Sequence, residues 1–388
     1  MVASYDVIVV GLGTAGAAVC MELARRGRSV LGLDAFSPPH DRGSHHGRSR
    51  SIRRAYLEGT AYVPMALRAW ELWRRLEHDT GSELLVETNN LTLGPAGAPA
   101  VEGFFKSAQA YNIPFEALNA AQVKRRWPQL SPPAGFVAGL EIEAGILFPE
   151  KCISALLGEA ASAGADLQIE EPVTGWEETP AGVEVETTRG RYEAGGLLLA
   201  AGVRNKVLAG PYGALLSSKR VPVHWVFPPS GSDYFLGAFP VNFWQVPKTS
   251  DAEKTGFFEF YALPAVGGAA VKTAPHNDLA DCNPEATPRK ATAAEEAVIR
   301  SVLRKTLPGL ASRPVRSQIC FYTLTADGHF LLGPLPESPR VFIAALAGHG
   351  FKFAPVLGEI LADILEGKAP AWDVGMFSPA RFVAGQDG

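Results

Sequence analysis

Cysteine is scarce in this chain of 388 residues. There are four, and they lie far apart at Cys20, Cys152, Cys282 and Cys320. Because no two of them form a CxxC pair, neither a disulfide framework nor a zinc site is indicated, and no metal site is expected. Few and separated thiols are typical of a reducing compartment, so a cytoplasmic location is predicted.

Long apolar runs and an excess of one charge are also lacking. No apolar stretch reaches the roughly 20 residues that a membrane span needs, and the N-terminus lacks the basic start of a signal peptide. The net charge of −4 creates no field that attracts nucleic acid or anionic lipid. We therefore expect a globular protein of two domains, without a membrane or nucleic-acid partner.

The first 34 residues have the pattern of a βαβ unit. Residues 5–10 (YDVIVV) are apolar and β-branched, as in a strand buried on both faces. Residues 17–26 have helical character, and residues 29–34 predict a second strand. This order of elements indicates a parallel sheet.

The turn between the first strand and the helix matches GxGxxG, the phosphate-binding loop of dinucleotide folds. Its residues are Gly11, Leu12, Gly13, Thr14, Ala15 and Gly16. The glycines permit a tight turn, a close approach to a pyrophosphate, and packing of the helix on the strand. Asp34 ends the second strand, where an acid can bind a ribose hydroxyl. The unit predicts a dinucleotide site, but it does not distinguish FAD from NAD.

The remainder of the chain predicts a mixed α/β fold. Residues 221–272 alternate and are rich in aromatic side chains, which indicates an antiparallel sheet with one buried face. The simplest assembly is a Rossmann-like FAD-binding domain in three pieces, with a substrate domain inserted in two. The expected segments of the first are 1–83, 148–218 and 319–388, and those of the second are 84–147 and 219–318.

Four further motifs carry a resemblance to a known family. Residues 44–56 (SHHGRSRSIRRAY) resemble SHHGxTRxIRxAY, and residues 272–276 keep a Lys and a His four apart. Residues 320–330 resemble CxYTxTxDxHF, and residues 348–353 match GHGFKF. These motifs span most of the chain. They resemble the monomeric sarcosine oxidase and N-methyltryptophan oxidase family, FAD-dependent amine oxidoreductases of the D-amino-acid oxidase superfamily.

The resemblance implies how the cofactor is held. It implies covalent FAD, with a thioether between Cys320 and the flavin 8-methyl carbon, whereas the other cysteines are expected to be structural. Residues 37–59 are loop-like and rich in Arg and His. Cofactor contacts are implied for the glycine turn, Asp34, this Arg- and His-rich loop and later parts of the chain. They are Gly11, Gly13, Thr14, Ala15, Gly16, Asp34, Ser44, His45, Ser49, Arg50, Val173, Gly202, Cys320, Gly348, His349, Gly350, Phe351 and Lys352.

The resemblance also implies a substrate site. Arg53 and Lys352 bind a carboxylate, and Arg50 lies over the flavin. Lys272 lies near flavin N5, where a cation stabilises the superoxide that forms from O2. The pocket is lined by His276, Tyr261 and Tyr322, and the expected catalytic residues are Lys272, His276, Arg50 and Tyr322.

Several of these residues also have an ordinary structural interpretation. A run of arginines is commonly a solvated face, and we interpret Arg42 and Arg54 in that way. A free cysteine such as Cys320 is commonly a core residue, and Tyr261 fits core packing equally well. Arg48 stands where the family commonly has Asp, which reverses a charge in this loop.

Together the motifs predict a monomeric flavin oxidase of sarcosine or another N-methyl amino acid. A hydride equivalent passes from the amine carbon to flavin N5, the imine hydrolyses, and O2 is reduced to H2O2. The alternatives are a flavin oxidase or dehydrogenase of a cyclic imino acid or another amine, an NAD-dependent dehydrogenase, and a flavin-binding sensor without catalysis.

Overall fold

The N-terminal βαβ unit forms as its sequence pattern predicts. Strand β1 spans Ser4–Val10, helix α1 spans Thr14–Arg25 and strand β2 spans Val30–Leu33. The two strands pair in parallel, and both of their faces are buried in hydrophobic clusters, which explains their continuous apolar character. This computed structural model describes residues 4–230, 233–248, 256–267 and 270–382, so the predicted alternating region 221–272 lies partly outside the described residues.

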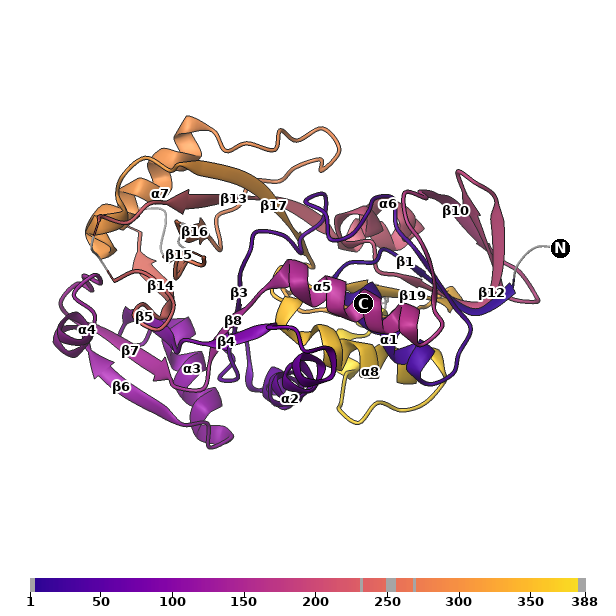
Figure 1. Cartoon of the computed structure of the whole chain (residues 1–388), viewed down its shortest axis with the longest axis horizontal. Coiled ribbons are helices and arrows are strands. Elements are labelled where there is room, and N and C mark those ends of the chain that lie inside the picture. The colour runs from indigo at the N-terminus through magenta and orange to yellow at the C-terminus, as the bar shows by residue number, and fades with distance from the viewer. Residues whose placement is uncertain (1–3, 231–232, 249–255, 268–269, 383–388) are drawn as a thin grey trace, which may run out of the picture.

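This unit belongs to an eight-stranded sheet in one lobe of the molecule (Figure 1). The strand order is β10-β11-β12-β1-β2-β9, and β19 pairs with both β12 and β18. The further strands are β9 (Asp166–Gln168), β10 (Val173–Glu178), β11 (Val183–Thr187), β12 (Arg191–Leu199), β18 (Leu331–Leu335) and β19 (Ser338–Ala345). Segments from the start, middle and end of the chain therefore form one sheet.

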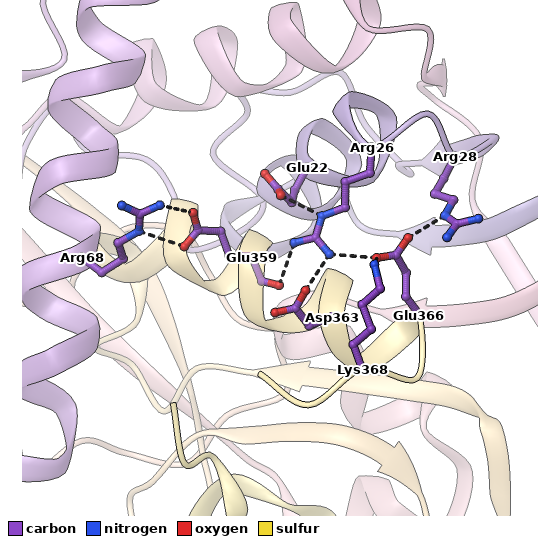
Figure 2. A network of polar contacts seen from close by, with 8 residues as sticks. All are labelled: Glu22, Arg26, Arg28, Arg68, Glu359, Asp363, Glu366 and Lys368. Carbon is purple, nitrogen blue, oxygen red and sulfur yellow. Dashed lines mark hydrogen bonds and ion pairs between the residues drawn. The ribbon is translucent and has the colours of Figure 1, made fainter. Parts of the chain in front are cut away.

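Helices α2 (Val63–Thr80), α5 (Pro149–Ser162) and α8 (Ala354–Leu365) pack with α1 in one hydrophobic cluster. Figure 2 shows an ion-pair network that joins the C-terminal ends of α1 and α8. In it, Arg26 donates hydrogen bonds to Asp363 at 2.6 Å and to Glu366 at 2.9 Å. Held together at these ends, the two helices run in the same direction. The N-terminus of α1 and the turn at residues 350–352, which leads into α8, line the cavity described below.

A second eight-stranded sheet forms the core of the other lobe. Its order is β17-β13-β16-β15-β14-β5-β7-β6. The strands are β5 (Asn90–Pro95), β6 (Phe115–Asn119), β7 (Phe136–Glu141), β13 (Ser217–Val226), β14 (Val241–Pro247), β15 (Phe257–Leu263), β16 (Val271–Pro275) and β17 (Arg316–Leu324). All neighbours are antiparallel except β14 and β5. That parallel pair joins strands from two distant segments, which no hairpin connects.

The outer face of this second sheet packs against helices α4 (Ala120–Arg126) and α7 (Ala293–Thr306), while α3 (Pro99–Ala110) contacts β5 and β7. Between the lobes lies a three-stranded sheet of β3 (Arg50–Ile52), β8 (Gly145–Leu147) and β4 (Leu85–Glu87). The predicted loop 37–59 therefore contains a short strand. Strands β13 and β17 run across the predicted boundaries at 219 and 319, and the five-segment division stays a prediction. No helix in the described parts of the chain is long and apolar enough to cross a bilayer.

Candidate active site

One continuous cavity extends from the glycine turn after β1 to the inner face of the second sheet. All predicted site residues except Gly16 line it. They are Gly11, Gly13, Thr14, Ala15, Asp34, Ser44, His45, Ser49, Arg50, Arg53, Val173, Gly202, Tyr261, Lys272, His276, Cys320, Tyr322, Gly348, His349, Gly350, Phe351 and Lys352. Gly16 lies behind this lining, where a Cβ would come within 1.8 Å of the carbonyl oxygen of Gly11. Its hydrogen therefore allows α1 to pack against the turn.

The dinucleotide end of the cavity is formed by the turn before α1. A Cβ on Gly11 would lie 2.7 Å from the carbonyl oxygen of Ala200, and its φ of +96° suits glycine. No side chain caps α1 at Gly13, so the first N–H groups of the helix remain available for phosphate oxygens. Burial alone raises the pKa of Asp34, but hydrogen bonds from His40 and two backbone N–H groups lower it overall. A pyrophosphate and a ribose fit this end.

Two cations lie side by side in the middle of the cavity. Lys272, on β16, donates to the carbonyl oxygens of Ser49 at 2.5 Å and Gly47 at 3.1 Å. Arg50 also donates to Ser49, and its Nη2 lies 3.8 Å from Cys320 Sγ. Burial and the charge of Arg50 hold the pKa of Lys272 well below its usual value. The arrangement is electropositive, and an anion that formed beside Lys272 would be stabilised.

The charge reversal at Arg48 lies outside this cavity. The side chain of Arg48 is exposed, and its backbone adopts a φ of +66°. Glu150, in the first turn of α5, accepts hydrogen bonds from the backbone N–H groups of Gly47 and Arg48. Glu150 thus holds the loop that carries Arg50. By contrast, Arg54 is not the surface residue that we expected, because it is partly buried and pairs with Glu141 and Glu143.

Arg53 and Lys352 face the carboxylate of Glu58, a residue outside the sequence motifs. Arg53 Nη2 donates to both carboxylate oxygens, at 3.1 and 3.2 Å, whereas the buried Nε of Arg53 has no partner among the described residues. Burial would raise the pKa of Glu58, but Arg53 and other cations lower it to about 2. Lys352 donates to the carbonyl oxygen of His349 and to Tyr56, and burial together with Arg53 lowers its pKa to about 7. The unpartnered Nε–H of Arg53, close to the Lys352 amine, fits a carboxylate ligand.

Aromatic side chains form the wall beside this cationic pair. His276 lies 3.4 Å from the hydroxyl of Tyr322, and its ring meets the ring of Phe243 edge-on. The guanidinium of Arg53 also lies over the Phe243 ring, 5.9 Å from its centre. Burial lowers the pKa of His276 to about 4, so the imidazole is neutral near pH 7. Tyr261 stands nearby on β15, and burial raises its pKa to about 12.

Three of the residues that line the cavity lie outside the recognised sequence motifs. Glu58 lies two residues beyond the recognised arginine motif, and an acid so close to Arg53 was the one available indication. Phe243 and Asn90 lie on β14 and β5, where the sequence shows only ordinary strand residues. They reach the cavity because these strands lie side by side in the sheet.

The fold and site together define a dinucleotide-binding α/β protein whose cavity ends in a cationic, aromatic-lined pocket. The chain belongs to the FAD dependent oxidoreductase family, whose profile matches residues 6–364. This confirms the family resemblance, the fold class and the dependence on FAD.

Curated relatives cover almost the whole chain. It is 35% identical to monomeric sarcosine oxidase of Streptomyces avermitilis over 98% of both chains. It is 34% identical to N-methyl-L-tryptophan oxidase of Yersinia pestis, over 97% of this chain and 99% of the relative. Among solved structures, NikD, described as an unusual amino acid oxidase essential for nikkomycin biosynthesis, matches with a TM-score of 0.84 and 26% identity over 97% of this chain and 98% of NikD.

Proposed function

We propose that this protein is an oxidase of secondary amino acids of the sarcosine or N-methyl type. The observation that carries the proposal is the pair of buried cations, Arg53 and Lys352, beside the neutral His276 in the cavity that reaches the glycine turn. The free Nε of Arg53 suits a ligand carboxylate. The names of the curated relatives support the same substrate class.

In this proposal the chain orients the substrate and sets its protonation. Arg53 and Lys352 hold the carboxylate, which fixes the amine and its carbon in the cavity. The surrounding cations disfavour an ammonium group, so the amine is bound with its lone pair free. The neutral His276 can accept a hydrogen bond from that amine. FAD, held by the glycine turn, Asp34 and the Arg50 loop, supplies the two-electron oxidation when bound.

A peroxide assay tests the proposal directly. The purified yellow protein is given sarcosine, N-methyl-L-amino acids and cyclic imino acids, and kcat/KM is compared. Higher values for the N-methyl compounds are expected. A higher value for a cyclic imino acid would move the assignment to the alternative amine substrate. A yellow protein that consumes no O2 with any of them would contradict an oxidase, and a colourless protein would contradict bound flavin.

We further propose that Cys320 carries the flavin covalently. Its buried sulfur lines the cavity, and Arg50 Nη2 lies 3.8 Å away. The Cys320→Ala variant is therefore expected to release its flavin into the supernatant on acid precipitation, while the native protein pellets yellow. Cys152→Ala, which removes another buried thiol, should behave like the native protein. If the flavin of Cys320→Ala stays in the pellet, the linkage lies elsewhere.

Lys352 is expected to make carboxylate binding depend on pH. Its pKa is about 7 in the ligand-free site, and a bound carboxylate would raise that pKa, so protonated Lys352 favours binding. The affinity for a carboxylate without an amine, such as 3-phenylpropionate, should be highest below pH 7. It should fall by about tenfold as pH rises to about 9.

Titration of the flavin absorbance measures this dissociation constant. Lys352→Met should bind weakly with a flat profile, whereas Lys368→Met, which removes an exposed lysine, should keep the native slope. A slope that survives in Lys352→Met would assign the titration to another group.

A further inference from the structure

Asn90, which lines the cavity, carries a buried amide that no contact in the described parts of the chain explains. The residue is completely buried, and neither Oδ1 nor Nδ2 has a hydrogen-bond partner among the described residues. A buried polar group without a partner lowers stability, and most such groups are satisfied in folded proteins. A leucine has nearly the same shape and would avoid this loss of stability. The presence of an amide here therefore suggests that a ligand supplies its hydrogen-bond partner.

The strand alternation directs Asn90 into the cavity. On β5, Leu91 and Leu93 belong to the hydrophobic cluster under α4 and α7, which lies on the outer face of the sheet. Asn90 lies on the opposite face and lines the cavity together with its neighbours Val241 and Phe243 on β14.

The cross-strand neighbour of Asn90 on β7 does not satisfy its amide. Asn90 is in register with Glu141 on β7, but the carboxylate of Glu141 accepts hydrogen bonds from the backbone N–H groups of Arg54 at 2.7 Å and Ala55 at 3.1 Å. Glu141 therefore serves the arginine loop and leaves the amide of Asn90 without a partner.

The polar groups of the simplest substrate do not account for this amide. Sarcosine offers a carboxylate, which Arg53 and Lys352 match, and an amine, but it has no third polar group. A substrate side chain with a hydrogen-bonding group would supply the missing partner.

We infer that Asn90 binds a polar group on the side chain of the substrate, so that the preferred substrate is a secondary amino acid with a hydroxyl, amide or similar group rather than sarcosine. This specificity rests on the proposed function. It makes Asn90 a specificity-determining residue, because its amide can both donate and accept a hydrogen bond.

Binding of matched acids without an amine tests the inference independently of turnover. One pair is 3-(4-hydroxyphenyl)propionate and 3-phenylpropionate, and a shorter pair is succinamate and 4-methylpentanoate. In the native holoenzyme, flavin absorbance should show about tenfold tighter binding of the polar member in at least one pair. In Asn90→Leu the two members of that pair should bind equally. Equal binding in both native pairs, or a preference that survives in Asn90→Leu, would overturn the inference.

Thr92→Val is the matched control. Thr92 is the next residue on the same face of β5, and its hydroxyl is also buried and unpartnered, but it does not line the cavity. Both Asn90→Leu and Thr92→Val should raise the melting temperature, because each removes an unpartnered polar group, but only Asn90→Leu should change the preference. If Thr92→Val changed the binding preference as much as Asn90→Leu does, the change would come from a general disturbance of β5, and the inference would be wrong. Asn90→Ala replaces Asn90→Leu if the larger side chain prevents folding.

Measurements of turnover distinguish a failure of this inference from a failure of the proposed function. The corresponding substrates are N-methyl-L-tyrosine with N-methyl-L-phenylalanine, and N-methyl-L-asparagine with N-methyl-L-leucine, beside sarcosine. The kcat/KM ratio within one pair should be about ten in the native enzyme and near one in Asn90→Leu. If no secondary amine is oxidised, the proposed function fails, and the binding ratios still decide the role of Asn90.

Discussion

The Lys272→Met variant is expected to be reoxidised by O2 about 10²- to 10³-fold more slowly than the native enzyme, with anaerobic reduction by substrate changed only a few-fold. Lys272 is buried, and among the described residues its Nζ donates hydrogen bonds to the carbonyl oxygens of Gly47 and Ser49 rather than to a carboxylate. The charge of Arg50 lies beside it. Negative charge that develops on O2 there would be stabilised by the ammonium, and methionine keeps the volume but removes the charge.

Stopped-flow measurement of the two half-reactions checks this prediction. Lys219→Met is the control, because Lys219 lies on the neighbouring strand β13 but pairs with Asp281 instead of lining the cavity. It should leave both half-reactions unchanged. Equal slowing of reduction and reoxidation in Lys272→Met would contradict a role in the reaction with O2.

Arg53→Met should weaken carboxylate binding by on the order of 10²-fold or more, seen as a higher Kd for 3-phenylpropionate and a higher KM for the substrate. The same change should also destabilise the protein, because Glu58 loses the cation that keeps its pKa at about 2. The loss should be on the order of 2–3 kcal/mol, less than for a fully buried pair because Glu58 faces the cavity.

The double variant Arg53→Met/Glu58→Gln separates these two effects. It removes the unpaired carboxylate of Glu58, so most of the decrease in melting temperature should be reversed. Binding of the ligand carboxylate should stay weak. Arg48→Met is the matched control, since it removes an exposed arginine from the same loop without touching the cavity. Recovery of binding together with stability would mean that Arg53 acts through folding and not by direct contact.

Most of the candidate site could be predicted because its parts are local in sequence. The glycine turn, α1 and Asp34 follow one another within a single βαβ unit, so their spacing determines their geometry. The motifs around Arg50, Lys272, Cys320 and Lys352 are also short. Recognising them was sufficient to name the residues that meet at one cavity, although their roles stay predictions.

Apart from Glu58, which lies close to Arg53 in sequence, the residues that surround these cations could not be predicted, because they come from other parts of the chain. The strand order of the second sheet brings Phe243 and Asn90 beside a pocket whose arginine loop lies far away in sequence. Likewise, only the folded loop shows that Arg48 points away from the cavity while Arg54 is drawn into ion pairs with Glu141 and Glu143.

The dinucleotide unit, the family and the cationic residues of the site follow from the sequence, because short motifs and strand or helix periodicity are local properties. Which side chains lie opposite those cations, and which buried polar groups have no partner among the described residues, follows from the folded chain. Burial, the pKa of Lys352 and the isolation of Asn90 depend on strand pairing between distant segments, which no local pattern encodes.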